Sequence, residues 1–179
     1  EVRRAAVVLA ESLPLLAREA ITDLRSHLTY LDGRIDYYEQ QLITLNRHCA
    51  PAQRIMTMPG IGPITASAIT ASVASGHEFS NGRQFAAWLG LVPRQNSTGG
   101  KTRLGRITKR GDAYLRTLLM LGARAVLQTA AQKTDRLSRW AVALRERRGY
   151  HRAVIAIAAK NARILWALLA READFVPVH

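Results

Sequence analysis

Apolar residues spaced alternately three and four positions apart constrain the fold of this 179-residue chain more than any other feature. The alternation runs unbroken from residue 21 to residue 45, which is the a/d pattern of a coiled coil maintained over three heptads. The seam consists of Ile21, Leu24, Leu28, Leu31, Ile35, Tyr38, Leu42 and Leu45. We therefore expect one long helix that ends near His48, with Gly33 inside it at a cost of about 1 kcal/mol relative to Ala.

Such a seam needs an apolar partner, and two partners are compatible with the sequence. The helix could lie on its own domain, or it could pair with a second copy. Residues 1–12 are helical in pattern but offer too short a partner within the chain. The seam thus favours a homodimer or higher oligomer. The chain also opens with Glu1 inside a helical pattern, so we expect it to be part of a longer protein.

The rest of the chain predicts a compact helical domain at residues 49–179, after coiled-coil and linker helices at 1–48. No segment shows a convincing strand alternation, so the predicted fold class is all-α, containing a helix-hairpin-helix motif. Asp112 or Gly111 is placed to cap one helix, Thr134 or Asp135 to cap the next, and Gly149 to end it. The expected helices of this domain span residues 52–57, 64–74, 83–89, 113–132, 136–147 and 151–171.

The charge balance predicts a polyanionic partner. Lys and Arg outnumber Asp and Glu by 26 to 13, for a net charge of +13. A membrane partner is disfavoured, because Lys160, Asn161 and Arg163 interrupt the most apolar stretch. Cys49 is the single cysteine, which indicates a reducing compartment, and the scattered histidines show no metal-ligand spacing.

A Gly-x-Gly turn between two predicted helices is a candidate phosphate clamp. Gly60 and Gly62 would leave the backbone open on either side of Ile61, and the next helix would begin there with its N–H groups directed at an anion. The motif, at residues 52–74, resembles a helix-hairpin-helix, which contacts backbone phosphates and not base sequence. The alternative is a purely structural turn.

A second candidate site is the glycine-rich stretch at residues 94–111, which we expect to be a mobile extended loop. Residues 79–111 contain seven cations and no Asp or Glu, whereas an ordinary solvated surface mixes both signs. This composition favours contact with nucleic-acid phosphates. The seven cations are Arg83, Arg94, Lys101, Arg103, Arg106, Lys109 and Arg110.

Ser97 and Thr98 lie in the middle of these cations. A hydroxyl in such a segment is ordinarily a turn or capping group. It could instead attack a phosphodiester, with Arg94, Lys101 and Arg103 stabilising the charge that develops on the phosphoryl oxygens. The segment contains no general base, so the base and any metal ion would come from elsewhere.

The blocks MPGIGPITASAI and GLVPRQNSTGGKTRLGRITKRG carry a specific resemblance. From residue 52 to 170 the chain closely resembles the C-terminal domain of the transposases of one group of bacterial insertion sequences. These are recombinases guided by a bridge RNA, with a RuvC-like DEDD domain before a coiled coil, and Piv-type DNA invertases are their relatives. The seam helix matches that coiled coil.

The resemblance implies a catalytic serine after the Pro-Arg of GLVPRQ, which corresponds to Ser97, with Thr98 as the near alternative. In the family this serine is thought to form a covalent phosphoserine link with DNA. An acidic Mg²⁺ cluster of the RuvC-like domain, contributed across a dimer, would complete the site in the bacterial cytoplasm, at the nucleoid. We find no such acidic set here, and expect this chain to bind DNA and a structured guide RNA without cutting on its own. The alternative is a non-catalytic DNA-binding and dimerisation module.

Overall fold

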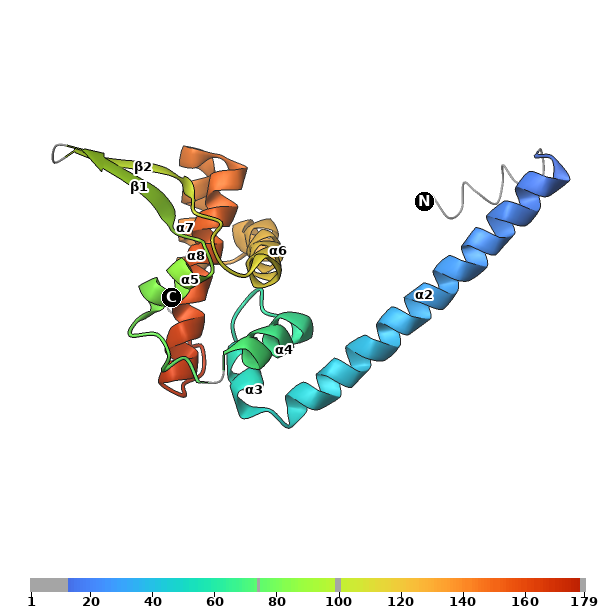
Figure 1. Cartoon of the computed structure of the whole chain (residues 1–179), viewed down its shortest axis with the longest axis horizontal. Coiled ribbons are helices and arrows are strands. Elements are labelled where there is room, and N and C mark those ends of the chain that lie inside the picture. The colour runs from blue at the N-terminus through green and yellow to red at the C-terminus, as the bar shows by residue number, and fades with distance from the viewer. Residues whose placement is uncertain (1–12, 74, 99–100, 178–179) are drawn as a thin grey trace. The chain divides into compact units, whose positions relative to one another are not determined.

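The computed structural model describes residues 13–73, 75–98 and 101–177 (Figure 1). Among them are seven α-helices, one 3-10 helix and one two-stranded sheet. The elements are α2 (Leu15–Arg47), α3 (Ala50–Met56), α4 (Pro63–Ser72), α5 (Gly82–Trp88), β1 (Pro93–Thr98), β2 (Lys101–Ile107), α6 (Ala113–Thr129), η1 (Ala130–Gln132), α7 (Arg136–Arg148) and α8 (Tyr150–Ala170). The helical pattern at residues 1–12 and residue 74 of a predicted helix lie outside the described residues.

The helices predicted from periodicity are confirmed, with small shifts at their ends. The predicted caps hold them. Asp112 accepts hydrogen bonds from the backbone N–H groups of Tyr114 and Leu115 at the start of α6. Asp135 caps α7, and the hydrogen bond from the Ser138 hydroxyl is the main cause that lowers the pKa of its carboxyl. Each cap satisfies donors that the first helical turn leaves unpaired.

The prediction of an all-α fold is wrong at one place. Residues expected to form an extended loop at 94–111 instead include most of an antiparallel hairpin, β1 with β2. The two strands are polar and lack the apolar alternation of a half-buried strand, because they are exposed rather than packed on a core. Their backbone hydrogen bonds, and not burial, define them.

The chain divides into two compact units, residues 1–41 and 42–179. In the first unit, α2 is the long helix that the heptads predict, about 50 Å including its last turns. Most of its seam is exposed, including Leu24, Leu28 and Ile35. The apolar face of α2 therefore has no cover within the described residues.

Helix α8 is the centre of the second unit, and α5, α6, α7 and α3 all pack against it (Figure 1). By length and composition it is also the one described helix that could cross a membrane. Half of that apolar window is buried inside the protein. Ala153, Ile157 and Leu165 are fully buried against the neighbouring helices. These observations explain its hydrophobicity as that of a core helix.

A close backbone contact joins the turn after α3 to the middle of α6. Gly60 has φ of +85°, and a Cβ atom there would lie 2.6 Å from the Gly122 carbonyl oxygen. Conversely, a Cβ on Gly122 would lie 2.0 Å from the Gly60 carbonyl oxygen. The two backbones can only approach this closely when both residues lack side chains. The Gly60 turn is therefore seated on α6.

Gly122→Ala tests this contact. In a free helix the change would stabilise by about 1 kcal/mol. Here we expect a net loss of about 1–3 kcal/mol, because the new methyl group overpacks the Gly60 carbonyl. Gly33→Ala on α2, where a Cβ would meet nothing within 4 Å, is the matched control and should not lower stability. Thermal unfolding measures both, and an increase in stability for Gly122→Ala would contradict the contact.

Candidate nucleic-acid interface

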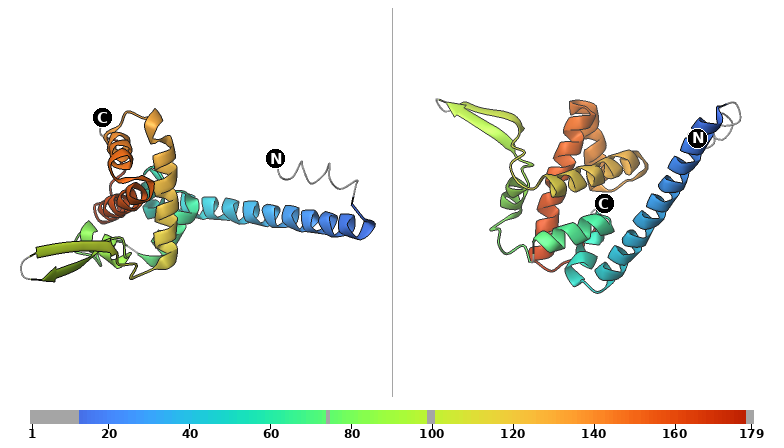
Figure 2. Two further views of the ribbon diagram at one scale, coloured as in Figure 1. Left: turned by 90° about the horizontal axis from the view of Figure 1, so that it is seen from above. Right: turned by 45° about the vertical axis from the view of Figure 1, so that its right-hand side comes forward.

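The hairpin pairs its strands in a defined register. Gln95 lies opposite Leu104 and Asn96 opposite Arg103, and the outermost backbone pair is Thr98 with Lys101. Near the base the register shifts by one residue, so that both Gly105 and Arg106 lie opposite Arg94. This is a β-bulge, which bends and twists a strand. Figure 2 shows the hairpin extending beyond the helices of its unit in both views.

Backbone hydrogen bonds anchor the hairpin base between α5 and α6. The Thr108 N–H donates to the Val92 carbonyl at 2.9 Å, and the Lys109 N–H donates to the Gly90 carbonyl at 3.1 Å. Gly90 has φ of +71°, and a Cβ there would lie 2.2 Å from the Arg110 carbonyl oxygen. Leu91, buried at 2 % exposure, fixes the same segment in the core. The base is rigidly connected to the helices, although the strands are exposed.

Arg116 is a positioning residue that sequence reasoning missed. From α6 its Nη1 donates to the Leu89 carbonyl at 3.1 Å and reaches the carbonyls of Gly111 and Asp112 at 3.5 Å. It thereby ties the end of α5 to the start of α6, on either side of the hairpin. Only the folded chain reveals this role, since Arg116 stands 27 residues from Leu89.

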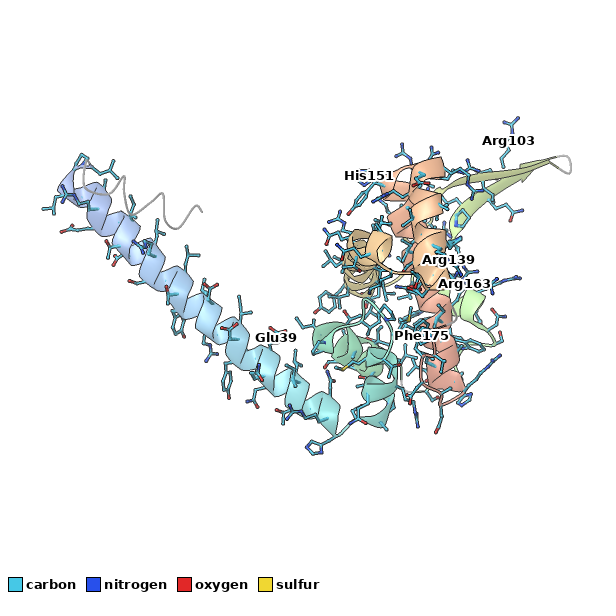
Figure 3. All side chains as sticks on the ribbon, turned by 180° about the vertical axis from the view of Figure 1, so that it is seen from behind. Glu39, Arg103, Arg139, His151, Arg163 and Phe175 are labelled. Atoms are coloured by element: carbon cyan, nitrogen blue, oxygen red, sulfur yellow. The ribbon has the colours of Figure 1, made fainter. Side chains whose placement is uncertain are left out.

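The described cations of the hairpin and its base are exposed and lack carboxylate partners. Among the described residues none of them forms an ion pair, and Arg94 donates only to the Thr108 carbonyl, at 3.3 Å. In Figure 3 the Arg103 side chain points away from the strands into open space. The exposed set comprises Arg94, Arg103, Arg106, Lys109 and Arg110. Lys101 lies in β2, but its side chain is outside the described part.

The structure places Ser97 and Thr98 in strand β1 and not in a turn. The Ser97 backbone pairs with Thr102, one position inside the Thr98–Lys101 pair. The prediction of a turn at these two residues is therefore wrong for their backbone, whereas the interpretation of their hydroxyls as capping groups stays a prediction. Their side chains lie outside the described part, so their role as nucleophiles stays a prediction.

The Gly-x-Gly turn is present between α3 and α4, but its three residues differ in access. Gly60 packs against α6, and Ile61 is buried, with its N–H donated to the Met58 carbonyl. Gly62 is exposed, caps α4 with extended backbone, and has open space where a side chain would stand. Of the three, Gly62 is the residue that a phosphate could approach most directly.

Asn46 is a second residue that the sequence did not single out. It lies near the end of α2, 4 % exposed, where its Nδ2 donates to the Pro63 carbonyl at 3.0 Å. Its Oδ1 accepts a hydrogen bond from the Ser67 hydroxyl at 2.8 Å. These two bonds connect the last turn of α2 to the start of α4, beside the exposed Gly62.

Arg83 lies on α5, where it lines a surface pocket with residues of α8, and not on the hairpin.

The described residues contain no cluster of metal ligands. Within residues 13–73, 75–98 and 101–177 no group of three or more His, Cys, Asp or Glu side chains could hold a metal ion. The described part therefore supplies no site of its own for the Mg²⁺ that the resemblance implies.

Comparison with known proteins shows that this chain is similar to transposases. Residues 52–138, which include the Gly turn and the whole hairpin, match the family model described as Transposase IS116/IS110/IS902 family. The chain is 52% identical over 173 residues to a "Probable family 20 transposase" of Pseudomonas aeruginosa. That alignment covers 96% of this chain and 51% of the relative.

Two further relatives carry similar names. A "Transposase for insertion sequence element IS1111A" of Coxiella burnetii is 44% identical, with 92% of this chain and 48% of the relative covered. A "Transposase for insertion sequence element IS1328" of Yersinia enterocolitica is 39% identical, with coverages of 93% and 50%. The matches support the class of insertion-sequence transposases for this chain. Within that class they support the IS116/IS110/IS902 family, and the chain spans about half the length of these relatives.

Arg116→Met tests the anchoring of the hairpin base. Losing hydrogen bonds from a charged donor should lower the local opening free energy by about 1.5 kcal/mol, so the Thr108 and Lys109 amides should exchange with solvent about tenfold faster. Arg124→Met is the matched control, because Arg124 is an exposed arginine on α6 whose side chain forms no hydrogen bond with the described residues. Hydrogen exchange followed by NMR measures both variants, and equal exchange would refute the anchor.

Proposed function

We propose that this chain is the strand-binding and strand-joining part of an insertion-sequence transposase. The observation that carries the proposal is the exposed β1–β2 hairpin, whose cations have no carboxylate partners among the described residues. A long like-charged arm is electrostatically unfavourable unless a polyanion neutralises it. The family match, which covers this hairpin, supports DNA as that polyanion.

The dimensions of the hairpin suit a nucleic-acid groove. Strands of six and seven residues are about 20 Å long, and a two-stranded ribbon fits the major groove of B-DNA. Arginines on both strands can then contact phosphates on either side of the groove. If the six predicted cations of the hairpin and its base made such contacts, log K would fall with log salt with a slope of about −5.

Within this arm, Ser97 is the proposed nucleophile and Thr98 its alternative. The hydroxyl oxygen would form a bond to phosphorus while the bond from phosphorus to the sugar oxygen breaks, which preserves a phosphodiester for rejoining. The hydroxyl proton has to pass to a base outside the hairpin, since residues 79–111 contain no Asp, Glu or His. The freed sugar oxygen takes up a proton. Neighbouring arginines would stabilise the charge on the non-bridging oxygens.

Other parts of the proposed transposase follow from the resemblance. The base, and the Mg²⁺ that assists phosphoryl chemistry, would belong to a RuvC-like acidic domain of the full-length protein, and a guide RNA would supply the target sequence. The exposed amide region at Gly62 would hold a second backbone phosphate. In this scheme the chain contributes the arm, its hydroxyl and the bundle that positions them.

Self-association is part of the same proposal. An exposed apolar stripe on a 33-residue helix is typical of a coiled-coil seam that a second copy covers. The seam residues are Leu24, Leu28, Leu31, Ile35, Tyr38, Leu42 and Leu45. Pairing would bring two hairpins into one assembly. Sedimentation velocity of the chain would detect the pairing, and a monomer at micromolar concentration would contradict it.

The second candidate function is a non-catalytic module that binds DNA through its helix-hairpin-helix and dimerises. It shares the hairpin, the Gly62 turn and the seam with the transposase proposal. It differs only in making Ser97 and Thr98 chemically inert. The turn packs tightly against α6, which makes it a rigid element. Both functions are compatible with a rigid turn, so this contact favours neither.

Ser97→Ala in the full-length protein separates the two functions. We expect strand exchange to fall below detection, because the alanine has no oxygen to bond to phosphorus, while DNA affinity stays within about twofold. Thr98→Ala is the matched control and should retain exchange. Recombination of a supercoiled plasmid and binding to duplex DNA are measured in parallel. Full exchange by Ser97→Ala would leave the non-catalytic module as the better account, unless Thr98→Ala abolishes it.

A further inference from the structure

A second basic surface, separate from the hairpin in sequence, lies on α7 and α8. Residues 133–163 contain nine Lys and Arg residues and two acidic ones. One of the acidic residues, Asp135, is already engaged as the N-cap of α7. This segment forms no part of the sequence-based assignment of nucleic-acid contacts, which ended at Arg110.

Three cations of this surface lie close together. The Lys160 ammonium on α8 sits 4.3 Å from the centre of the Trp140 ring on α7. Burial lowers the pKa of the Lys160 ammonium from its ordinary value, and the positive charges of Arg136 and Arg163 lower it further. The ring holds Lys160 in place but neutralises neither arginine.

A surface pocket between α5 and α8 adds a further cation, Arg83 of α5, to this group. A pocket of about 360 Å³ is lined by Asn81, Gly82 and Arg83 from the start of α5 and by Arg163, Trp166 and Ala167 from α8. The two helices touch here, since a Cβ on Gly82 would lie 2.8 Å from the Arg163 carbonyl oxygen. Arg83 and Arg163 thus flank one hollow although they are 80 positions apart.

The walls of this pocket are fixed by hydrogen bonds. The Trp166 Nε1 donates to the carbonyls of Gly76 and Phe79, at 2.9 and 3.1 Å. The Asn81 side chain accepts from the backbone N–H groups of Arg83 and Gln84. Arg83 and Arg163 are exposed, and in the part of the chain that the structure describes neither forms an ion pair. The result is a preformed hollow with exposed cations at its rim.

We propose that Arg83, Arg136, Lys160 and Arg163 form a second phosphate-binding face, the α5–α8 basic face, which holds a nucleic-acid strand independently of the hairpin. These four cations come from three helices, none of them forms an ion pair within the described residues, and together they fit a run of neighbouring backbone phosphates. The guanidinium groups offer paired donors to phosphate oxygens. This inference rests on the proposed function, because it takes the polyanion to be nucleic acid, and it assigns Arg83 to this face and not to the hairpin.

The test compares salt dependence across matched double variants of the whole chain. Arg83→Gln/Arg163→Gln removes two charges from the face, and Arg103→Gln/Arg106→Gln removes two from the hairpin. Arg124→Gln/Arg171→Gln, which removes two exposed charges outside both the hairpin and residues 133–163, is the control. Arg83→Lys/Arg163→Lys keeps the charge at the face. The probes are a short duplex DNA and a single-stranded RNA, followed by fluorescence anisotropy, with unfolding midpoints measured for every variant.

The face variant should reduce the slope of log K against log salt for the nucleic acid that the face holds. The reduction is about 1.8 if that is duplex DNA and about 1.4 if it is single-stranded RNA. The control should leave both slopes unchanged. The lysine variant should keep the slope of the unmodified chain. A face variant that matches the control on both probes would overturn the second face. If the hairpin variant alone loses slope, the proposed function stands without it. If the unmodified chain binds neither probe, both proposals fail.

Discussion

The hairpin depends on the backbone connection at its base more than on any interaction within its strands. An isolated two-stranded hairpin is at best marginally stable in water, and this one has polar, exposed strands with little apolar surface to bury. The Gly90 and Val92 carbonyls, bonded to the amides across the base, fix where the strands begin. Arg116 holds the two flanking helices together, and the packing of α5 and α6 on α8 makes that base part of the core. The arm is therefore placed by the bundle, while its described cations are exposed.

The placement of the hairpin matters because of the positive charges that it presents. The hairpin and the α7–α8 surface both gather cations, and within the described residues almost none of those cations meets a carboxylate. The one ion pair described in the second unit, Arg54 with Glu172 at 3.0 Å, lies instead at α3 and the C-terminal tail. A protein gains nothing in stability from unneutralised clusters of this kind. Their presence on folded elements supports the proposal that a nucleic acid supplies the counter-charge.

The helices could be predicted because their signals are local. Heptad spacing marked α2, and Asp112, Asp135 and Gly149 marked helix ends that the structure confirms. The hairpin has one local signal, the two glycines between residues 98 and 101, but the same pair is also typical of a flexible loop. The strands are polar, so they show no alternation of apolar and polar residues that would predict a sheet. The seven-cation stretch led to the segment proposed as the site, which stays a prediction, but it gave no signal of the strand conformation.

What remained beyond prediction was contact between distant residues. Nothing local says that Gly60 must touch Gly122, that Arg116 reaches Leu89, or that Arg83 shares a pocket with Arg163. Each depends on how helices separated by tens of residues pack, which periodicity cannot specify. Ser97 and Thr98 differ from these contacts, because the resemblance identifies them from the sequence. The structure adds that their backbone lies in a strand.

The most direct test of the central claim is site-specific crosslinking from the hairpin. A photoreactive benzoyl-phenylalanine in place of Leu104, which is 65% exposed on β2, should crosslink to duplex DNA on irradiation and lose the crosslink at high salt. The same group in place of Leu121, 51% exposed on α6, is the control and should give little product. Absence of a crosslink at position 104, or equal yields at both positions, would contradict the account of the hairpin as the arm that holds DNA.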